Sequence, residues 1–203
     1  MLAAYSGLVS TPTSTGRYAK GIAKRQQILE AVLAAYSDPD GREPSFKEIA
    51  DSVSLSEKGM NHYFGSKNEL LVAVLEERDR VDALAFQPPL TFEERAGLIA
   101  AHNQQTPRLL RLFLEMAAAS SNPEHPAHAF FSARYTRLLE QLQQWIATTT
   151  NADPETAEWR ARTLIAASDG LQIQWLLDPT FDLRDAIIRL GHTLTDPRSQ
   201  VQP

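Results

Sequence analysis

The sequence contains no cysteine among its 203 residues. Disulfide bonds, thiolate metal sites and catalytic thiols are therefore excluded, and the absence is compatible with the reducing cytoplasm. The chain also lacks a G-x-S-x-G motif and a glycine-rich phosphate-binding loop, which are signatures of several enzyme classes. These absences argue against an enzyme, and we expect no cofactor.

Long hydrophobic runs are also missing. No apolar run approaches the roughly 18 residues that a membrane-spanning helix needs. The first segment, MLAAYSGLVSTPTSTG, lacks the basic start and the apolar stretch of a signal peptide. Its Ser, Thr and Gly content predicts a disordered arm over residues 1–16. We expect a cytoplasmic protein without a membrane partner.

An overall excess of basic charge is absent as well. The net charge of −5 is unusual for a protein that coats nucleic acid. The acidic residues are concentrated in the second part, because residues 81–203 hold 14 acidic and 10 basic side chains, whereas residues 1–80 hold 11 and 10. A basic run, Arg17, Lys20, Lys24 and Arg25, precedes the first acidic residue. Such a local patch can attract phosphate even when the average charge cannot.

Helical periodicity is present along nearly the whole chain, and strand alternation is almost absent. The sequence therefore predicts an all-α fold of about nine helices without an internal repeat. A long helix is expected over residues 68–86, and capping residues at Thr91, Asp153 and Asp182 predict the starts of three later helices.

Two short helices joined by a tight turn are predicted near the N-terminus. Ser45 and Glu48 form a capping box that begins the first helix, and an apolar stripe at helical spacing follows. The second short helix begins after a break and covers residues 56–63. Ser66 opens the long helix that follows. This arrangement is a helix-turn-helix, which places its second helix in the major groove of DNA.

The second short helix carries few apolar residues. Met60 and Phe64 suffice to hold one side against a core. Asn61 can bind adenine bidentately, and Lys58 can donate to guanine. Gly59 lies within this helix, where glycine costs roughly 1 kcal/mol relative to alanine. Its presence suggests that the backbone approaches the groove closely. The outer side therefore holds four candidates for base contacts: Lys58, Gly59, Asn61 and His62.

Phosphate contacts are expected at the edges of this surface. Tyr63 and Lys67 lie where they would fix the register on the duplex. The amides that follow Ser56 form the positive end of the second helix, which can face a phosphate. Any one of these residues alone is more typical of a solvated polar side chain than of a DNA contact. The prediction therefore rests on the ordered set of caps, apolar stripe, break and polar helix.

The segment SFKEIADSVSLSEKGMNHYFGSKNELL resembles the DNA-binding segment of TetR-family transcriptional regulators. The resemblance extends over residues 22–79. It implies an all-helical homodimer with a DNA-binding domain at residues 17–66 and an effector-binding and dimerisation domain at residues 67–203. It also implies a repressor that binds palindromic double-stranded operator DNA and is released by a small-molecule effector.

Matched by position, Ser45, Tyr63 and Lys67 correspond to the family's phosphate contacts. The four outer residues of the second short helix fall on the reading face. Ser54 occupies the place of the family's turn glycine, so it must adopt or avoid a left-handed conformation. Asn61 replaces a common tyrosine, so operator preference cannot be carried over.

The predicted effector pocket is formed by aromatic, soft and polar residues of the C-terminal part. Each of them also fits an ordinary core position. Asp169 lies in an apolar helix and either binds an effector or satisfies a hydrogen bond at a dimer interface or helix end. The candidates are His102, Phe113, Met116, Phe131, Tyr135 and Asp169.

The apolar stripes of the last two helices are candidates for the dimer interface, although such stripes can also meet the chain's own core. The segment SDGLQIQWLLDP within them is similar to the penultimate helix of many family members of actinobacterial type. The candidate residues are Leu164, Leu171, Trp175, Leu183, Ile187, Leu190 and Leu194.

Two other classes of function compete with a regulator. An all-α enzyme could use Asp169, or His125 and His128, which with Glu124 give a possible metal-binding spacing. Interrupting prolines make this segment a loop, so we expect no metal. A ligand-binding helical module with a vestigial helix-turn-helix is the third possibility.

Overall fold

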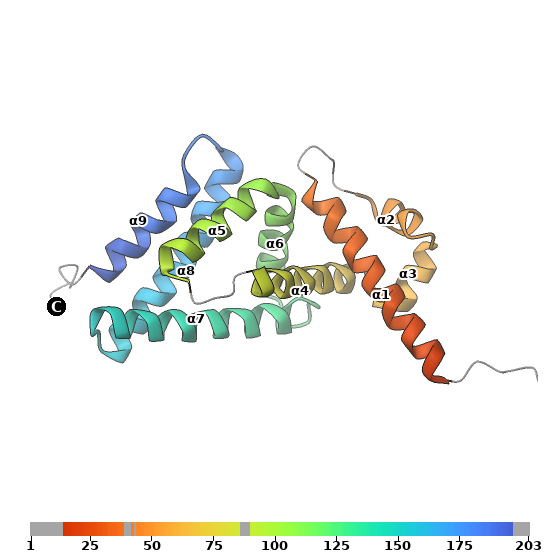
Figure 1. Cartoon of the computed structure of the whole chain (residues 1–203), viewed down its shortest axis with the longest axis horizontal. Coiled ribbons are helices and arrows are strands. Elements are labelled where there is room, and N and C mark those ends of the chain that lie inside the picture. Colours follow the sequence, from red (N-terminus) through yellow and green to blue (C-terminus); the bar gives the residue numbers. More distant parts are fainter. Residues whose placement is uncertain (1–13, 39–41, 43, 86–89, 197–203) are drawn as a thin grey trace, which may run out of the picture.

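The computed structural model describes residues 14–38, 42, 44–85 and 90–196, and within these ranges the chain forms nine α-helices and no strand. The helix-turn-helix segment and α1 lie at one end of the molecule, α5–α9 form the other end, and α4 lies between them (Figure 1). The predicted all-α fold is confirmed. The helices are α1 Ser14–Ser37, α2 Phe46–Ser52, α3 Glu57–Phe64, α4 Lys67–Ala85, α5 Phe92–Gln105, α6 Pro107–Ala119, α7 His128–Thr150, α8 Pro154–Leu177 and α9 Leu183–Thr195.

Helix boundaries differ from the expected ones by a few residues. Helix α1 begins at Ser14, so the last three residues of the predicted disordered arm are helical, while residues 1–13 lie outside the described part. Helix α4 ends at Ala85, and Phe86, where we expected its end, also lies outside the described residues.

Side-chain caps begin several helices where the sequence predicts them. The Ser45 hydroxyl accepts from the Glu48 amide over 3.2 Å, and the Glu48 carboxylate accepts from the Ser45 amide over 2.8 Å. Thr91 forms the same type of capping box at α5. Asp153 and Asp182 accept amide hydrogen bonds at the starts of α8 and α9. Each cap satisfies donors that the first helical turn leaves free.

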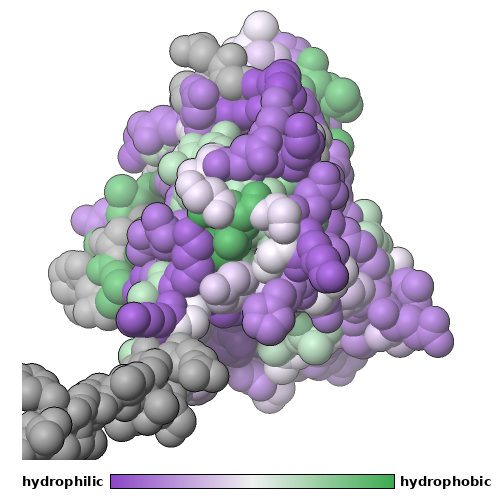
Figure 2. Space-filling view, turned by 90° about the vertical axis from the view of Figure 1, so that its right-hand side faces the viewer, coloured by the Kyte–Doolittle hydropathy of each residue, from purple (hydrophilic) through white to green (hydrophobic). Residues whose placement is uncertain are grey.

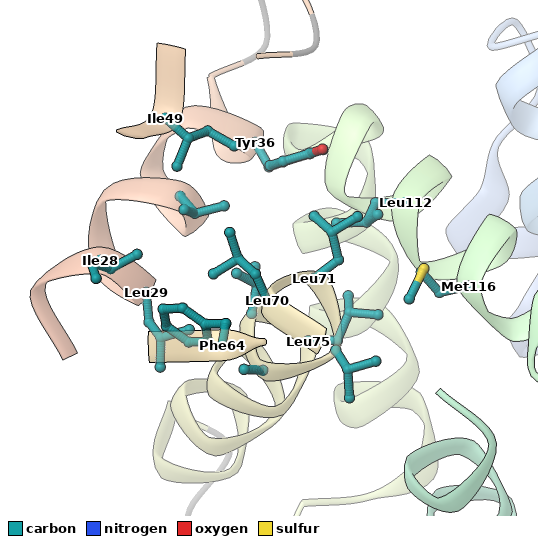
Figure 3. Packing of buried hydrophobic residues seen from close by; sticks show 14 of the residues in the cluster. Ile28, Leu29, Tyr36, Ile49, Phe64, Leu70, Leu71, Leu75, Leu112 and Met116 are labelled. Carbon is teal, nitrogen blue, oxygen red and sulfur yellow. The ribbon is translucent and has the colours of Figure 1, made fainter. Parts of the chain in front are cut away.

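The largest hydrophobic cluster extends from α1 to α7. Phe64 of α3 and Leu71 and Leu75 of α4 belong to it together with Leu112 and Met116 of α6 (Figure 3). Because close-packed interiors transmit displacement, a shift of α4 against α6 must change the packing beneath α3.

A second cluster joins α5, α6, α8 and α9. Leu110, Trp175 and Leu183 belong to its buried centre. No helix in the described part of the chain combines the length and apolar character required to cross a membrane.

Candidate DNA interface and internal cavity

The turn between α2 and α3 is tight and contains a left-handed residue. Ser54 has φ 56°, so it adopts the conformation that glycine adopts without strain. The turn is held by a hydrogen bond from the Leu55 amide to the Ala50 carbonyl over 2.9 Å. Lys24 of α1 donates from Nζ to the Val53 carbonyl over 2.7 Å. The orientation of α3 is therefore fixed by α1 as well as by α2.

Helix α3 has one buried side and one exposed side. Met60 is 0% exposed and Phe64 is 7% exposed, so both anchor the helix in the core. The side chains of Lys58, Asn61 and His62 are exposed on the opposite side. These three side chains are therefore available to a partner, as the sequence predicts.

Gly59 lies near the start of α3 and is partly exposed. Its amide donates to the Ser56 hydroxyl over 3.1 Å, which caps the helix. A Cβ at this position would be 3.5 Å from the nearest side-chain atoms. Steric crowding within the chain therefore does not explain the glycine.

The residues predicted to contact phosphate surround α3. Ser45, Ser56 and Lys67 are exposed, and Tyr63 is partly buried. The Tyr63 ring meets the His62 ring edge to face, with centroids 5.7 Å apart. Figure 2 views this end of the molecule, and its surface is mostly hydrophilic around a small hydrophobic spot. The roles of these four residues as phosphate contacts remain predictions.

The basic residues of α1 have different surroundings. Lys24 holds the turn, and the Arg25 guanidinium lies 4.8 Å from the centre of the Phe64 ring in a cation–π contact. The Arg17 side chain lies outside what the structure describes. Lys47 of α2, which sequence analysis did not select, is exposed two residues after Ser45. The sequence feature that could have identified Lys47 is its position close to Ser45, a predicted phosphate contact.

An internal cavity of about 180 Å³ lies among the helices of the other end. Three of the residues predicted for an effector pocket line it: Phe113, Tyr135 and Asp169. Its complete lining is Arg78, Phe92, Arg95, Ala96, Ile99, Asn103, Phe113, Arg134, Tyr135, Leu138, Leu142, Leu164, Ile165, Ser168, Asp169, Gln172 and Ile187.

Three of the predicted pocket residues lie elsewhere. Met116 and Phe131 belong to the buried core that includes α1–α4. His102 does not line the cavity, and its Nε2 lies 4.0 Å from Asp82 Oδ1 on α4. The type of side chain in a helical stripe does not reveal whether the residue faces a core or a cavity, so the sequence could not separate these three residues from those that line the cavity.

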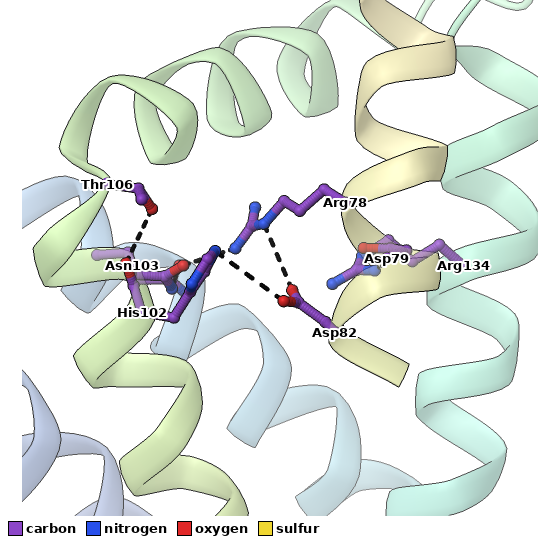
Figure 4. Close-up of polar contacts among 8 residues, drawn as sticks. Arg78, Asp79, Asp82, His102, Asn103, Thr106 and Arg134 are labelled. Carbon is purple, nitrogen blue, oxygen red and sulfur yellow. Dashed lines mark hydrogen bonds and ion pairs between the residues drawn. The ribbon is translucent and has the colours of Figure 1, made fainter. Parts of the chain in front are cut away.

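Buried polar side chains that the sequence analysis missed link three helices beside the cavity. Arg78 of α4 donates from Nη2 to Asn103 Oδ1 over 2.6 Å, and Asn103 Nδ2 donates to Gln172 Oε1 on α8 over 2.9 Å. Figure 4 shows Arg78 and Asn103 on their separate helices. The sequence feature that could have predicted the burial of Arg78 is its spacing, because it follows Val74 by four residues and Leu75 by three and so shares their buried face.

Asp169 makes a hydrogen bond within the chain. The Tyr135 hydroxyl of α7 donates to Asp169 Oδ2 over 2.7 Å. Burial raises the pKa of the Asp169 carboxyl, against the opposing effects of this hydrogen bond and of the Arg134 charge. Burial and the neighbouring carboxylate also raise the pKa of Tyr135. The pair therefore closes one wall of the cavity between α7 and α8.

The predicted dimer residues need a correction. Four of them are 7% exposed or less and pack inside the chain's own core, where they cannot offer a surface to a partner: Leu164, Trp175, Leu183 and Ile187. The other three, Leu171, Leu190 and Leu194, are partly buried.

Exposed apolar side chains lie on the other side of α8. Trp159 is 56% exposed, Ile173 is 49% exposed and Leu177 is 81% exposed. Both sides of α8 carry apolar residues, and the sequence does not reveal which side packs in the chain's own core. In the structure the predicted stripe is the buried side.

The two histidines considered for metal binding have partners within the chain. His125 Nε2 lies 3.2 Å from Asn68 Nδ2, and His128 Nδ1 lies 2.9 Å from the Ser120 carbonyl oxygen. In the described part of the chain no group of three or more acidic, histidine or cysteine side chains could hold a metal ion.

Comparisons with known proteins agree with these features. The family model of BetI-type transcriptional repressors, C-terminal region, matches residues 97–196. The chain is 25% identical over 178 residues to the HTH-type transcriptional regulator PksA of Bacillus subtilis (strain 168), a match that covers 82% of this chain and 85% of PksA.

Solved structures show the same fold. A TetR-family transcriptional regulator from Streptomyces coelicolor superposes with a TM-score of 0.67 at 18% identity, covering 85% of this chain and 79% of that one. A TetR-like regulator from Rhodococcus sp. RHA1 gives a TM-score of 0.61 at 19% identity, covering 87% and 96%. These relatives are regulators of transcription and not enzymes. With the family model, the relative and the shared fold in agreement, the chain belongs to the TetR family of transcriptional regulators.

Proposed function

We propose that the chain is a repressor that binds a palindromic DNA operator as a homodimer and is released when a small molecule occupies the internal cavity. Residues 17–66 are the DNA-binding domain in this proposal, and residues 67–203 bind the effector and dimerise. The observation that carries it is the exposed polar side of α3, whose opposite side is anchored by Met60 and Phe64. The similarity to BetI-type transcriptional repressors supports repression. Such a protein acts where the DNA is, which predicts a cytoplasmic location.

The residues of the interface divide into two roles. Lys58, Asn61 and His62 read base edges in the major groove, and Gly59 lets the backbone approach closely. The phosphate contacts set the register and contribute affinity without sequence preference. They are made by Ser45, Ser56, Tyr63 and Lys67.

The homodimer forms through the free side of α8. Trp159, Ala166, Gly170, Ile173 and Leu177 recur at spacings of seven or of three and four, so they share one side of the helix. A Cβ added at Gly170 would meet no atom within 4 Å in the described part of the chain. Glycine costs a helix about 1 kcal/mol relative to alanine, and the close approach of a second copy accounts for that cost.

Release from DNA follows from a change in the separation of the two α3 helices. Binding of both half-sites requires them to lie roughly 34 Å apart, one turn of DNA. Helix α4 packs against α3 at one end and contributes Arg78 to the cavity at the other. A ligand that favours another position of α4 lowers the affinity for DNA, and DNA lowers the affinity for that ligand by the same factor.

Selection of binding sites from a random DNA pool tests the proposal. We expect a palindromic site, two copies of the chain per site and affinity that falls steeply with salt. Equal affinity for selected and random duplexes at low salt would contradict it and would favour a ligand-binding module without DNA recognition.

Single substitutions test the two roles on the selected site. Asn61→Ala should cost about 1–3 kcal/mol and relax the preference at one base pair in each half-site. Lys67→Ala should weaken all duplexes to a similar degree and reduce the salt dependence by about one phosphate contact. Binding measured by fluorescence anisotropy on the selected site and its single-base variants separates these results, and identical patterns from both variants would refute the assignment.

A further inference from the structure

The lining of the cavity is rich in positive charge. Three arginines line it, Arg78, Arg95 and Arg134, and Asp169 is the one carboxylate in the lining. Asp169 Oδ2 already accepts the Tyr135 hydroxyl over 2.7 Å. A cationic ligand would have to share this carboxylate and approach three guanidinium groups, whereas an anionic ligand would meet charges of opposite sign.

Two of these arginines have buried donors without acceptors. The Nε atoms of Arg78 and Arg134 are buried, and neither finds a hydrogen-bond acceptor in the described part of the chain. Both guanidinium groups lie beside the Phe113 ring, 5.5 Å and 5.0 Å from its centre. Buried donors without acceptors are costly and rare. Arg78, Arg134 and Phe113 all line the cavity, so the positive charge of both guanidinium groups lies on one wall of it.

The carboxylates that pair with the two arginines come from α4. Asp79 accepts a hydrogen bond from Arg134, and Asp82 Oδ2 lies 3.6 Å from Arg78 Nε. Neither aspartate lines the cavity. The two arginines are thus paired with carboxylates from the α4 side, and both also line the cavity, where an anion could compete for them.

We propose that the cavity binds a small carboxylic acid with a single ring, its carboxylate held by Arg134 and Arg78 and its ring enclosed by apolar side chains. This inference rests on the proposed function, because it names the chemical class of the effector. The size follows from the volume: a 150 Å³ apolar cavity in another protein holds benzene, and this cavity measures about 180 Å³. The apolar side chains for the ring include Phe92, Leu138, Leu142, Ile165 and Ile187.

Such an anion would act on α4 directly. Arg134 belongs to α7 and pairs with Asp79 of α4, so a ligand carboxylate competes with Asp79 for the same guanidinium. Weakening of this ion pair loosens α4 from α7, and α4 packs against α3. The chemistry of the ligand and the release of DNA are therefore linked through one arginine.

Titration calorimetry with a matched set of probes tests the inference on the full-length protein. Phenylacetate, phenylacetamide and phenethylamine share one ring and differ in charge. We expect phenylacetate to bind at least about tenfold more tightly than the other two, because charge-assisted hydrogen bonds are roughly twice as strong as neutral ones. Cyclohexanecarboxylate should likewise bind more tightly than cyclohexanecarboxamide. Equal or tighter binding of the amides or the amine, or no binding of either acid, would overturn the proposal.

Two substitutions with opposite expected effects separate ligand binding from a structural role. Arg134→Gln should weaken phenylacetate binding about tenfold, and Arg134→Lys should weaken it less. Asp79→Asn should strengthen it, because the competing carboxylate is gone. If the ion pair between Arg134 and Asp79 were only structural, both substitutions would weaken phenylacetate binding. Unchanged or reduced affinity for phenylacetate in Asp79→Asn would therefore refute the competition.

DNA binding without ligand is measured in parallel on the selected operator. If the protein binds the operator and no carboxylate, the ligand class is wrong and the proposed function stands. If it binds phenylacetate with the expected ranking and no operator, the ligand class stands and the proposed function is wrong. Displacement of operator by phenylacetate in the wild type, reduced in Arg134→Gln, is the result expected when both are correct.

Discussion

Ser54 is the residue at which the local conformation and the amino-acid type disagree. Its φ of 56° is in the left-handed region, which costs a residue with a Cβ roughly 1 kcal/mol. The sequence located the turn, but it left open whether the serine adopts this conformation. The hydrogen bonds of the turn and the contact from Lys24 decide the question, and these depend on tertiary packing.

Ser54→Gly should stabilise the protein. Glycine removes the strain in the folded state and adds conformational entropy to the unfolded state, so the net gain should be about 0.5 kcal/mol. The free energy of unfolding from urea denaturation measures it. Ser54→Val, which brings a β-branched side chain to the same position, should destabilise by about 1 kcal/mol or more, and the opposite order of the two variants would contradict the assignment of strain.

Asp169 should make the stability of the protein depend on pH. Burial raises the pKa of its carboxyl in the folded state, so between the unfolded and folded pKa values the folded state binds more protons than the unfolded state. The contribution of Asp169 is therefore complete below the unfolded pKa of about 3.9 and is lost as the pH rises through the folded pKa. Asp169→Asn keeps an acceptor for the Tyr135 hydroxyl and removes the titration.

The stability of this variant relative to the wild type should accordingly increase from acidic to neutral pH. Chemical denaturation of both proteins across this range measures the difference. A difference that stays constant would show that burial of the charge makes no contribution, and a decrease towards neutral pH would reverse the sign of the argument.

At the scale of elements, capping chemistry made the helix starts predictable. Ser45, Ser56 and Thr91 each accept an amide hydrogen bond at the start of their helix, and this chemistry needs only residues that are close in sequence. The exposed side of α3 was predictable for a related reason, because its short apolar set fixes which side must face the core.

The cavity and the free side of α8 were not predictable in the same way. Arg78, Asn103 and Gln172 come from three helices, and only the packing of those helices brings their polar groups together. Leu164 and Ile173 are both apolar residues of α8, yet one is buried at 2% exposure and the other is 49% exposed. Periodicity defines a helix, and tertiary packing decides which neighbour each side meets.

Gly59→Ala should separate the stability of α3 from its recognition of DNA. The new Cβ would be at ordinary contact distance, 3.5 Å, from Leu55 and Ser56, so the helix should gain about 1 kcal/mol. The added methyl group should at the same time hold the backbone away from the groove and lower operator affinity about tenfold. Urea denaturation and anisotropy titration measure the two effects, and unchanged affinity would remove Gly59 from the reading surface.

Gly65→Ala provides the matched control. Gly65 has φ 77°, and a Cβ there would collide with the Glu69 carboxylate. This variant should destabilise the protein by about 1 kcal/mol or more. A stability gain at Gly59 together with a loss at Gly65 would show that the two glycines of this segment serve different purposes.

At the scale of the whole molecule, α3 lies at one end and the helices that supply most of the cavity lining, α5, α7 and α8, lie at the other, with α4 between them (Figure 1). One continuous core connects α1–α4 with α6 and α7, while the free side of α8 belongs to the end that holds the cavity. DNA recognition by a palindrome requires a second copy with two-fold symmetry. The proposed dimer contact is thus a condition for tight operator binding as well as for assembly.

Leu177→Glu should convert the proposed dimer to a monomer without damaging the fold. Leu177 is 81% exposed in the single chain, so its replacement leaves the core of each copy intact. In a two-fold contact the change occurs twice, and burying one leucine is worth about 1.5–3 kcal/mol, so the dimer dissociation constant should rise at least about a hundredfold. Analytical ultracentrifugation measures the assembly, and operator affinity should fall as the dimer dissociates.

Leu98→Glu on α5, where the leucine is 44% exposed, is the control that should remain dimeric. If Leu177→Glu also remains dimeric and binds the operator normally, then the two copies meet elsewhere, and the absence of a side chain at Gly170 needs another cause.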